Sequence, residues 1–111
     1  MRIAEQSPRM CKDGSIRWYH GDTFVLTFEF NIQDDEGNSI EFKKNDKIEI
    51  FLVNYKSERV ARFEAIATGT LQMYVDEDLS EKLVEGVYSL DARFNGEFIT
   101  TLMKKNKVVV E

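Results

Sequence analysis

The amino-acid sequence predicts an all-β fold, a two-sheet antiparallel β-sandwich of seven or eight short strands, on the basis of three observations. Apolar side chains alternate with polar ones along much of the chain, which is the period of a strand buried on one face. Turn-forming residues interrupt this alternation about every ten residues, a spacing typical of a sandwich. The pattern contains no crossover helices of the kind that a parallel α/β sheet needs. The same spacing allows a closed β-barrel as the alternative.

The composition is that of one folded domain, and it excludes several classes of function. A chain of 111 residues is the size of a single domain, and its 42% hydrophobic and 12% aromatic residues are too many for a disordered segment. Its 20 acidic residues outnumber its 15 basic ones, and this excess of negative charge opposes binding to nucleic acid. No apolar run approaches the roughly 18 residues that span a bilayer, and residues 1–6 lack the apolar stretch of a secretion signal. We therefore expect a protein made in reducing cytosol, with neither nucleic acid nor a membrane as its partner.

The start of the chain divides into two regions of different pattern. Residues 1–14 follow neither the helical nor the strand period and contain the only proline, Pro8, so we expect an N-terminal arm or loosely held segment there. A β-sandwich domain is expected over 15–111, where alternation begins at Ile16. The strongest alternation covers 22–32 and predicts a half-buried strand. The inward side chains of this strand are large and apolar: Phe24, Leu26, Phe28, Phe30 and Ile32.

A surface loop and two further strands follow. Acidic and turn-forming residues fill 34–39 and predict the loop. Alternation resumes at 48–53, where Phe51 and Val53 make the second face apolar as well. We therefore expect this strand to be covered on both sides or to lie near an interface. Residues 60–66 carry a weaker pattern that suits an edge strand.

The second half of the chain predicts one helical turn between strands. After a short strand at 71–75, a helical turn is expected near 78–84, with Asp78 as its N-cap and Gly86 as its stop. Alternation then returns over 87–94 and predicts another strand.

The end of the chain predicts a hairpin. Asn95-Gly96 indicates a two-residue turn, because both positions tolerate positive φ. The returning strand is expected over 97–103, and 108–110 forms a last strand or its continuation. The resulting seven or eight strands favour the immunoglobulin-like form of the sandwich.

Residues suited to catalysis or metal binding are few and scattered. Cys11 is the only thiol and His20 the only imidazole, and neither a nucleophile elbow nor a glycine-rich phosphate loop accompanies them. We expect His20 at a surface turn and Cys11 as an inert thiol. The acidic cluster at 34–36 fails the calcium-loop spacing, and 76–78 is expected to be a solvated turn beside the helix. The sequence therefore predicts no catalytic residue, no cofactor and no metal site.

Side chains not assigned to the core by pattern give two hypotheses for function. The first is a contact surface for other proteins, because aromatic residues anchor interfaces. The residues of this predicted interface are Phe51, Val53 and Tyr55. The second hypothesis is a platform for sugar rings, formed if three other aromatic residues gather on one face. The residues of this predicted platform are Trp18, Tyr19 and Tyr74.

The order of the short motifs resembles that of a known family of domains. The motifs are Gly21-Asp22-Thr23 at the start of the long strand, Gly37 in the acidic turn, Leu79 to Leu83 followed by Gly86-Val87-Tyr88, and Thr100-Thr101-Leu102 in the closing hairpin. Between Ile16 and Val110 the chain is similar to small immunoglobulin-like domains of tailed-phage and prophage structural proteins. The nearest of these is the N-terminal domain of baseplate upper proteins from phages of Gram-positive bacteria.

The resemblance implies a structural role and no bond-breaking chemistry. It implies a virion or tail-assembly component that docks to other protein subunits, with copies of the same chain among the partners. Such a component would be made in the host cytoplasm and then built into the tail. The glycine-aspartate pair and Tyr88 would serve the fold, at the start of a core strand and at the turn into the penultimate strand.

Overall fold

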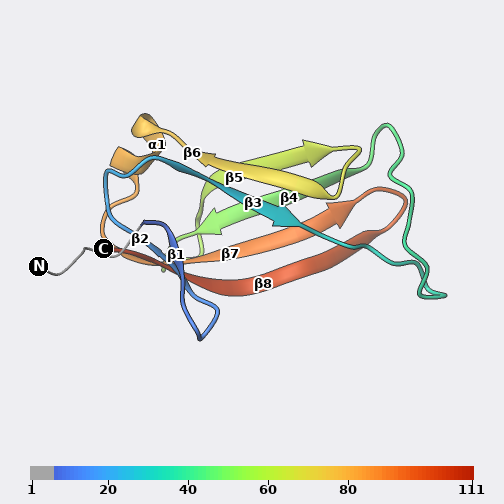
Figure 1. Cartoon of the computed structure of the whole chain (residues 1–111), viewed down its shortest axis with the longest axis horizontal. Helices are drawn as coiled ribbons and strands as arrows, with labels where there is room; N and C mark the ends of the chain where they lie inside the picture. The colour runs from blue at the N-terminus through green and yellow to red at the C-terminus, as the bar shows by residue number, and fades with distance from the viewer. Residues whose placement is uncertain (1–6) are drawn as a thin grey trace, which may run out of the picture.

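The computed structural model describes residues 7–111, in which eight strands and one short helix form two sheets that pack against each other (Figure 1). The strands are β1 (Arg9–Met10), β2 (Ile16–Trp18), β3 (Phe24–Glu29), β4 (Lys47–Val53), β5 (Arg59–Ile66), β6 (Thr70–Val75), β7 (Gly86–Asn95) and β8 (Ile99–Val110), and the helix is α1 (Glu77–Lys82). The predicted all-β sandwich with a single helical turn is confirmed.

The larger sheet has six strands in the order β1-β2-β8-β7-β4-β5, and β3 and β6 form the smaller sheet. The strands β8-β7-β4-β5 of the larger sheet face β3-β6 across the core. No strand pairing joins the two sheets within residues 7–111, so the closed barrel does not form. The strands are antiparallel except β2 and β8, which run parallel with Trp18 opposite Val110. The expectation of purely antiparallel sheets is wrong at this pair, because no short turn joins β2 to β8 and fixes their direction.

The hydrophobic core lies between the sheets and follows the alternation of the strands. In β3, Phe24, Leu26 and Phe28 point inward, as their period predicts, while the residues between them are exposed. Fully or almost fully buried partners come from the central strands: Ile48, Ile50 and Leu52 of β4, Leu71, Met73 and Val75 of β6, and Leu90, Ala92 and Phe94 of β7. Each fully buried large apolar side chain stabilises the fold by about 1.5 to 3 kcal/mol before entropy is counted.

The N-cap of the helical turn lies two residues earlier than predicted. Asp76 is the N-cap: its backbone is extended, and its carboxylate accepts a hydrogen bond of 2.9 Å from the Leu79 amide. Asp78 lies in the first turn instead, where its charge favours the N-terminal end of the helix. Residues 76–78 are all acidic, and because β6 ends at Val75, Asp76 is the one that takes the N-cap position.

The closing hairpin is wider than predicted. Asn95 pairs with Ile99, so three residues, 96–98, form the loop in place of a two-residue turn at Asn95-Gly96. Gly96 does not adopt positive φ; glycine is needed there because a Cβ would lie 2.5 Å from Asp46 Oδ1 and 2.7 Å from Phe94 Cζ. Packing against the loop that precedes β4 therefore sets this turn.

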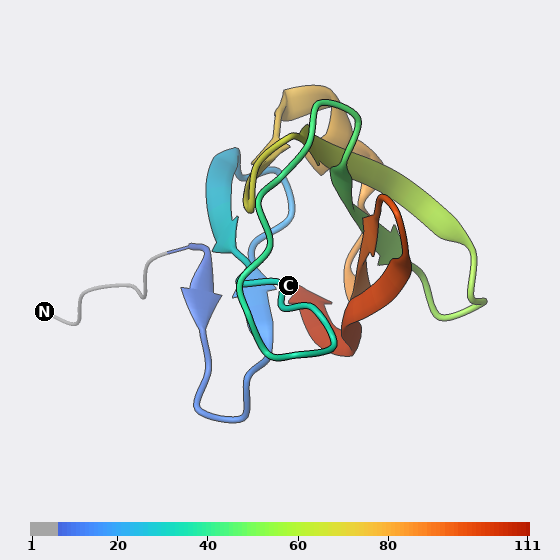
Figure 2. The same cartoon turned by 90° about the vertical axis from the view of Figure 1, so that its right-hand side faces the viewer.

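The segment expected as an arm contributes a strand to the sheet. Arg9–Met10 forms β1, which pairs antiparallel with β2, and the Arg9 guanidinium forms an ion pair with Glu111. Figure 2 shows the β1–β2 hairpin projecting from the body of the sandwich. Residues 1–6 of the predicted arm lie outside the described residues.

Candidate docking surface

Two of the three predicted interface residues lie on the face of the large sheet that points away from the core, which we call the outer face. In β4, Ile48, Ile50 and Leu52 point into the core, so Glu49, Phe51 and Val53 point to the outer face. The middle of β4 is nevertheless buried on both of its faces. Of the two alternatives considered for this strand, cover on both sides is therefore what the structure shows.

Phe51 is covered by arginine side chains from both neighbouring strands. Its ring is only 5% exposed, and the guanidinium carbons of Arg59 and Arg93 lie 3.9 Å and 5.3 Å from its centroid. Both distances lie within the range of cation–π interactions. Phe51 is thus a platform for two arginines, whereas the interface hypothesis requires its ring to be available to a partner.

Glu49 is a buried charge on the same face, next to Arg93 and Arg62. It is 3% exposed, and its carboxylate accepts hydrogen bonds from Arg62 Nη2 at 2.7 Å, Arg93 Nε at 3.0 Å and Asn95 Nδ2 at 3.4 Å. Burial alone would raise the pKa of Glu49, but these hydrogen bonds outweigh it and lower the pKa from 4.5 to about 2. The carboxylate therefore stays ionised and orients the arginines of the outer face.

An exposed apolar groove lies at the end of the sandwich where the β4–β5 loop meets the segment between α1 and β7. We call it the Tyr55 groove; its volume is about 240 Å³. Its exposed apolar walls are Tyr55, Val60, Val84 and Val87, and Lys82 and Glu85 lie beside them. Tyr55 is 82% exposed and Val84 63%.

The floor of this groove is held in place by Tyr88. Its hydroxyl donates a hydrogen bond of 2.8 Å to the Val84 carbonyl, so the chain between α1 and β7 is held to the beginning of β7. This is the hydrogen bond of the tyrosine corner found in immunoglobulin-like domains. The segment that carries Val84 is thus held in place by a hydrogen bond, beside the exposed apolar side chains of the groove.

Tyr55 was among the predicted interface residues, whereas the other walls of the groove were not predicted. Val60, Val84 and Val87 come from separate segments, and a solitary exposed valine carries no local signal. Val53 is half-buried at the end of β4, two residues before Tyr55. Of the predicted interface, only Tyr55 lines the groove.

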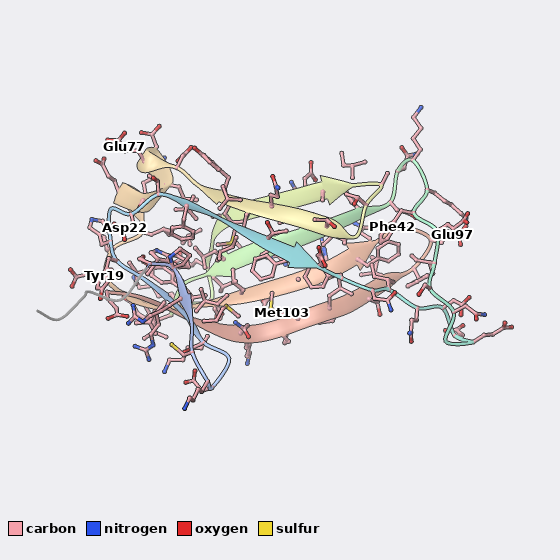
Figure 3. All side chains as sticks on the ribbon, in the orientation of Figure 1. Tyr19, Asp22, Phe42, Glu77, Glu97 and Met103 are labelled. Carbon is pink, nitrogen blue, oxygen red and sulfur yellow. The ribbon has the colours of Figure 1, made fainter. Side chains whose placement is uncertain are left out.

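The three residues of the predicted sugar platform do not form one. Trp18 is completely buried in the core, with its ring centroid 4.9 Å from that of Phe24. Tyr19 lies at the end of the sandwich that carries α1 and contacts Arg9 (Figure 3). Tyr74 is exposed on the outward side of the small sheet, directly opposite Val25.

The residues considered for catalysis and metal binding have structural contacts. His20 is exposed, with Nδ1 2.9 Å from the Leu83 carbonyl oxygen, and its backbone amide donates to the Glu111 carbonyl. Asp34 accepts hydrogen bonds from the amides of Glu36 and Asn38 and so closes its own turn. Within residues 7–111, no three His, Cys, Asp or Glu side chains gather in a way that would hold a metal ion.

A second hollow lies at the opposite end of the sandwich and is more polar. Its volume is about 350 Å³, and Glu41, Asp46, Glu97 and Phe98 are among its lining residues. Its charges are largely paired: Lys43 forms an ion pair with Glu97, and Asp46 accepts a hydrogen bond from the Lys43 amide. Phe42 and Glu97 mark this end in Figure 3.

Comparison of the chain with protein-family models, with curated proteins and with solved structures gave no match. Across residues 7–111, no helix has the length and apolar character needed to cross a membrane.

Proposed function

We propose that this chain is a non-enzymatic assembly module that docks to other protein subunits through the Tyr55 groove. The observation that carries the proposal is the gathering of Tyr55, Val84 and Val87, all more than half exposed, around one groove. Contiguous exposed apolar side chains with charged residues beside them are typical of protein contact sites. Tyrosine at the centre of such a site is a common anchor of binding energy.

The kind of assembly belongs to the proposal as well and rests on the resemblance of the motifs. A tail or baseplate of phage type is built from many copies of small domains that bind one another without catalysing a reaction. A docking groove on a rigid sandwich suits that role, because a preorganised surface loses little conformational entropy on binding. The sugar-platform alternative has less support, since its largest ring, Trp18, belongs to the core.

Site-specific photo-cross-linking tests the proposal. Replacing Tyr55 by p-benzoylphenylalanine puts the photoreactive group in the groove, and the same replacement at Tyr74 provides a control that is 60% exposed on the other sheet. In the particles or cells that contain the protein, we expect position 55 to form discrete adducts with protein subunits. The additional substitution Val87→Asp should remove these adducts, because it places a charge in the apolar wall.

Two outcomes would overturn the proposal. One is the absence of protein adducts from position 55 in the assembled particle or intact cell. The other is the same set of adducts from positions 55 and 74, which would show non-specific collision.

A further inference from the structure

β5 is a long edge strand whose outer side is open. It ends the order of the large sheet, and within residues 7–111 no strand pairs with its outer edge. Figure 2 shows β5 at the margin of the molecule, diverging from β6. The opposite edge of the same sheet is β1, which has only two residues and so offers little to pair with.

The hydrogen-bond pattern identifies the backbone groups that face outward. The Ala67 amide donates to the Asp46 carbonyl at 2.7 Å, and β5 continues from there in register with β4, with Ala65 opposite Ile48. Hydrogen-bonded positions alternate in an antiparallel pair. The amides and carbonyls of Ala65, Phe63 and Ala61 therefore point to β4. Those of the remaining residues point outward: Ile66, Glu64 and Arg62.

The side chains of β5 lack most devices that keep edge strands apart. Proteins protect edges with proline, with lysine, with charges that point into the core or with β-bulges. The register of β5 on β4 is irregular near Val60, at the start of the strand, and regular from Ala61 to Ile66. The inward residues of β5 are Ala61, Phe63 and Ala65, none of which is charged, and the strand contains neither proline nor lysine. Its outer-face charges are Arg59, Arg62 and Glu64, and the two in the middle of the strand, Arg62 and Glu64, are of opposite sign.

We propose that two copies of this chain pair through their β5 strands, antiparallel, about a two-fold axis at Phe63. This inference rests on the proposed docking role. It names a second copy of the chain as one partner, and the edge of β5 as a contact surface in addition to the Tyr55 groove. In this register Arg62 lies opposite Glu64 of the second copy, twice over by symmetry. Ala61 then lies opposite Ala65. In each Arg62–Glu64 pair, the outward-pointing amide of each residue donates to the outward-pointing carbonyl of the other.

Charge and hydrogen bonding select this register over its neighbours. A shift of one residue would place outward-pointing amides opposite residues whose backbone groups point to β4, so the hydrogen bonds would be lost. A shift of two residues would place Arg62 opposite Arg62 or Glu64 opposite Glu64, and like charges directly opposite each other are destabilising. The register about Phe63 is the one that satisfies both conditions along the strand.

The same register brings two exposed apolar residues opposite each other. Val60 and Ile66 are 41% and 58% exposed in the single chain. In the pair, Ile66 of each copy lies opposite Val60 of the other, where the register of β5 on β4 shifts. Val60 also lines the Tyr55 groove, and because the strands are antiparallel the two grooves lie at opposite ends of the joined sheet.

Sedimentation from micromolar to millimolar concentration tests the pairing. We expect a monomer–dimer equilibrium, and Glu64→Lys should raise the dissociation constant about tenfold because it replaces two attractive pairs by two repulsive ones. Glu29→Lys on β3 is the matched control, with the same change of charge at an exposed strand position, and should leave the constant unchanged within about twofold. Urea unfolding of each variant establishes that the fold is retained.

Amide hydrogen exchange by NMR tests the register directly. On raising the concentration, the amides of Arg62, Glu64 and Ile66 should gain protection, while those of Phe63 and Ala65 are protected throughout. A protein that remains monomeric to millimolar concentration would overturn the inference, as would a dimer in which the outward amides gain no protection. Neither result would bear on the cross-links from position 55, so the docking role and the β5 pairing fail separately.

Discussion

Replacement of the buried carboxylate, Glu49→Gln, should cost this protein a large part of its stability at neutral pH. The pKa of Glu49 falls from 4.5 to about 2 in the folded protein, and each pKa unit is worth about 1.4 kcal/mol. The ionised carboxylate therefore stabilises the fold by about 3 kcal/mol at pH 7. Glutamine keeps the shape of the side chain but not the charge that Arg62 and Arg93 surround.

The pH dependence of this effect has a definite sign. Because the folded-state pKa lies below the unfolded one, the stabilisation is fully present above about pH 5. It is lost as the pH falls from about 4.5 towards 2, where the carboxylate becomes protonated in the folded state as well. The difference between wild type and Glu49→Gln should thus be constant from pH 5 to 7 and shrink steadily below that range.

Urea unfolding followed by the fluorescence of Trp18, the only tryptophan, measures this difference. Glu64→Gln is the matched control: Glu64 also binds Arg62, but its side chain is 37% exposed, so we expect a loss below about 1 kcal/mol. Equal stability of wild type and Glu49→Gln at pH 7 would refute the reasoning. So would a difference that does not change between pH 6 and pH 3.

Three further substitutions test the parts of the fold that frame the groove and the hairpin. Asp76→Ala removes the N-cap of α1 and should lower the free energy of unfolding by about 1 kcal/mol, measured in urea; an unchanged midpoint would contradict the capping role. Tyr88→Phe deletes the hydrogen bond to the Val84 carbonyl and should cost about 1 kcal/mol, with faster amide exchange between α1 and β7 as its signature. Gly96→Ala should cost about 1 to 3 kcal/mol in thermal unfolding, because its methyl group would meet Asp46; a neutral result would show that this loop relaxes freely.

The strands were predictable wherever a single strand carries its own pattern. The inward residues of β3 and β6 follow a period of two, and that period alone assigns Phe24 and Met73 to the core. The helical turn was predictable from its acidic start, although its N-cap was predicted at Asp78 and lies at Asp76. In these places the local sequence and the tertiary packing agree.

Residues whose surroundings come from several strands were not predictable in this way. Glu49 reads as an ordinary polar position in β4, and only the pairing of β4 with β5 and β7 brings Arg62 and Arg93 to it. The same pairing covers Phe51, for which the pattern alone left two alternatives, cover on both sides or a position near an interface. The hairpin at Gly96 differs for the same reason, since contact with Asp46 overrides the preference of Asn-Gly for a tight turn.

The parallel contact between β2 and β8 has a consequence for how the domain is made. β2 needs Val108 to Val110 as its neighbours, and these are the last residues of β8 to be synthesised. Nearly all of the domain must therefore leave the ribosome before β2 can pair with β8. Until then, the apolar side chains of β2 lack these neighbours. Contacts so distant along the chain also slow folding. Closure of this sandwich therefore waits until Val108 to Val110 have left the ribosome.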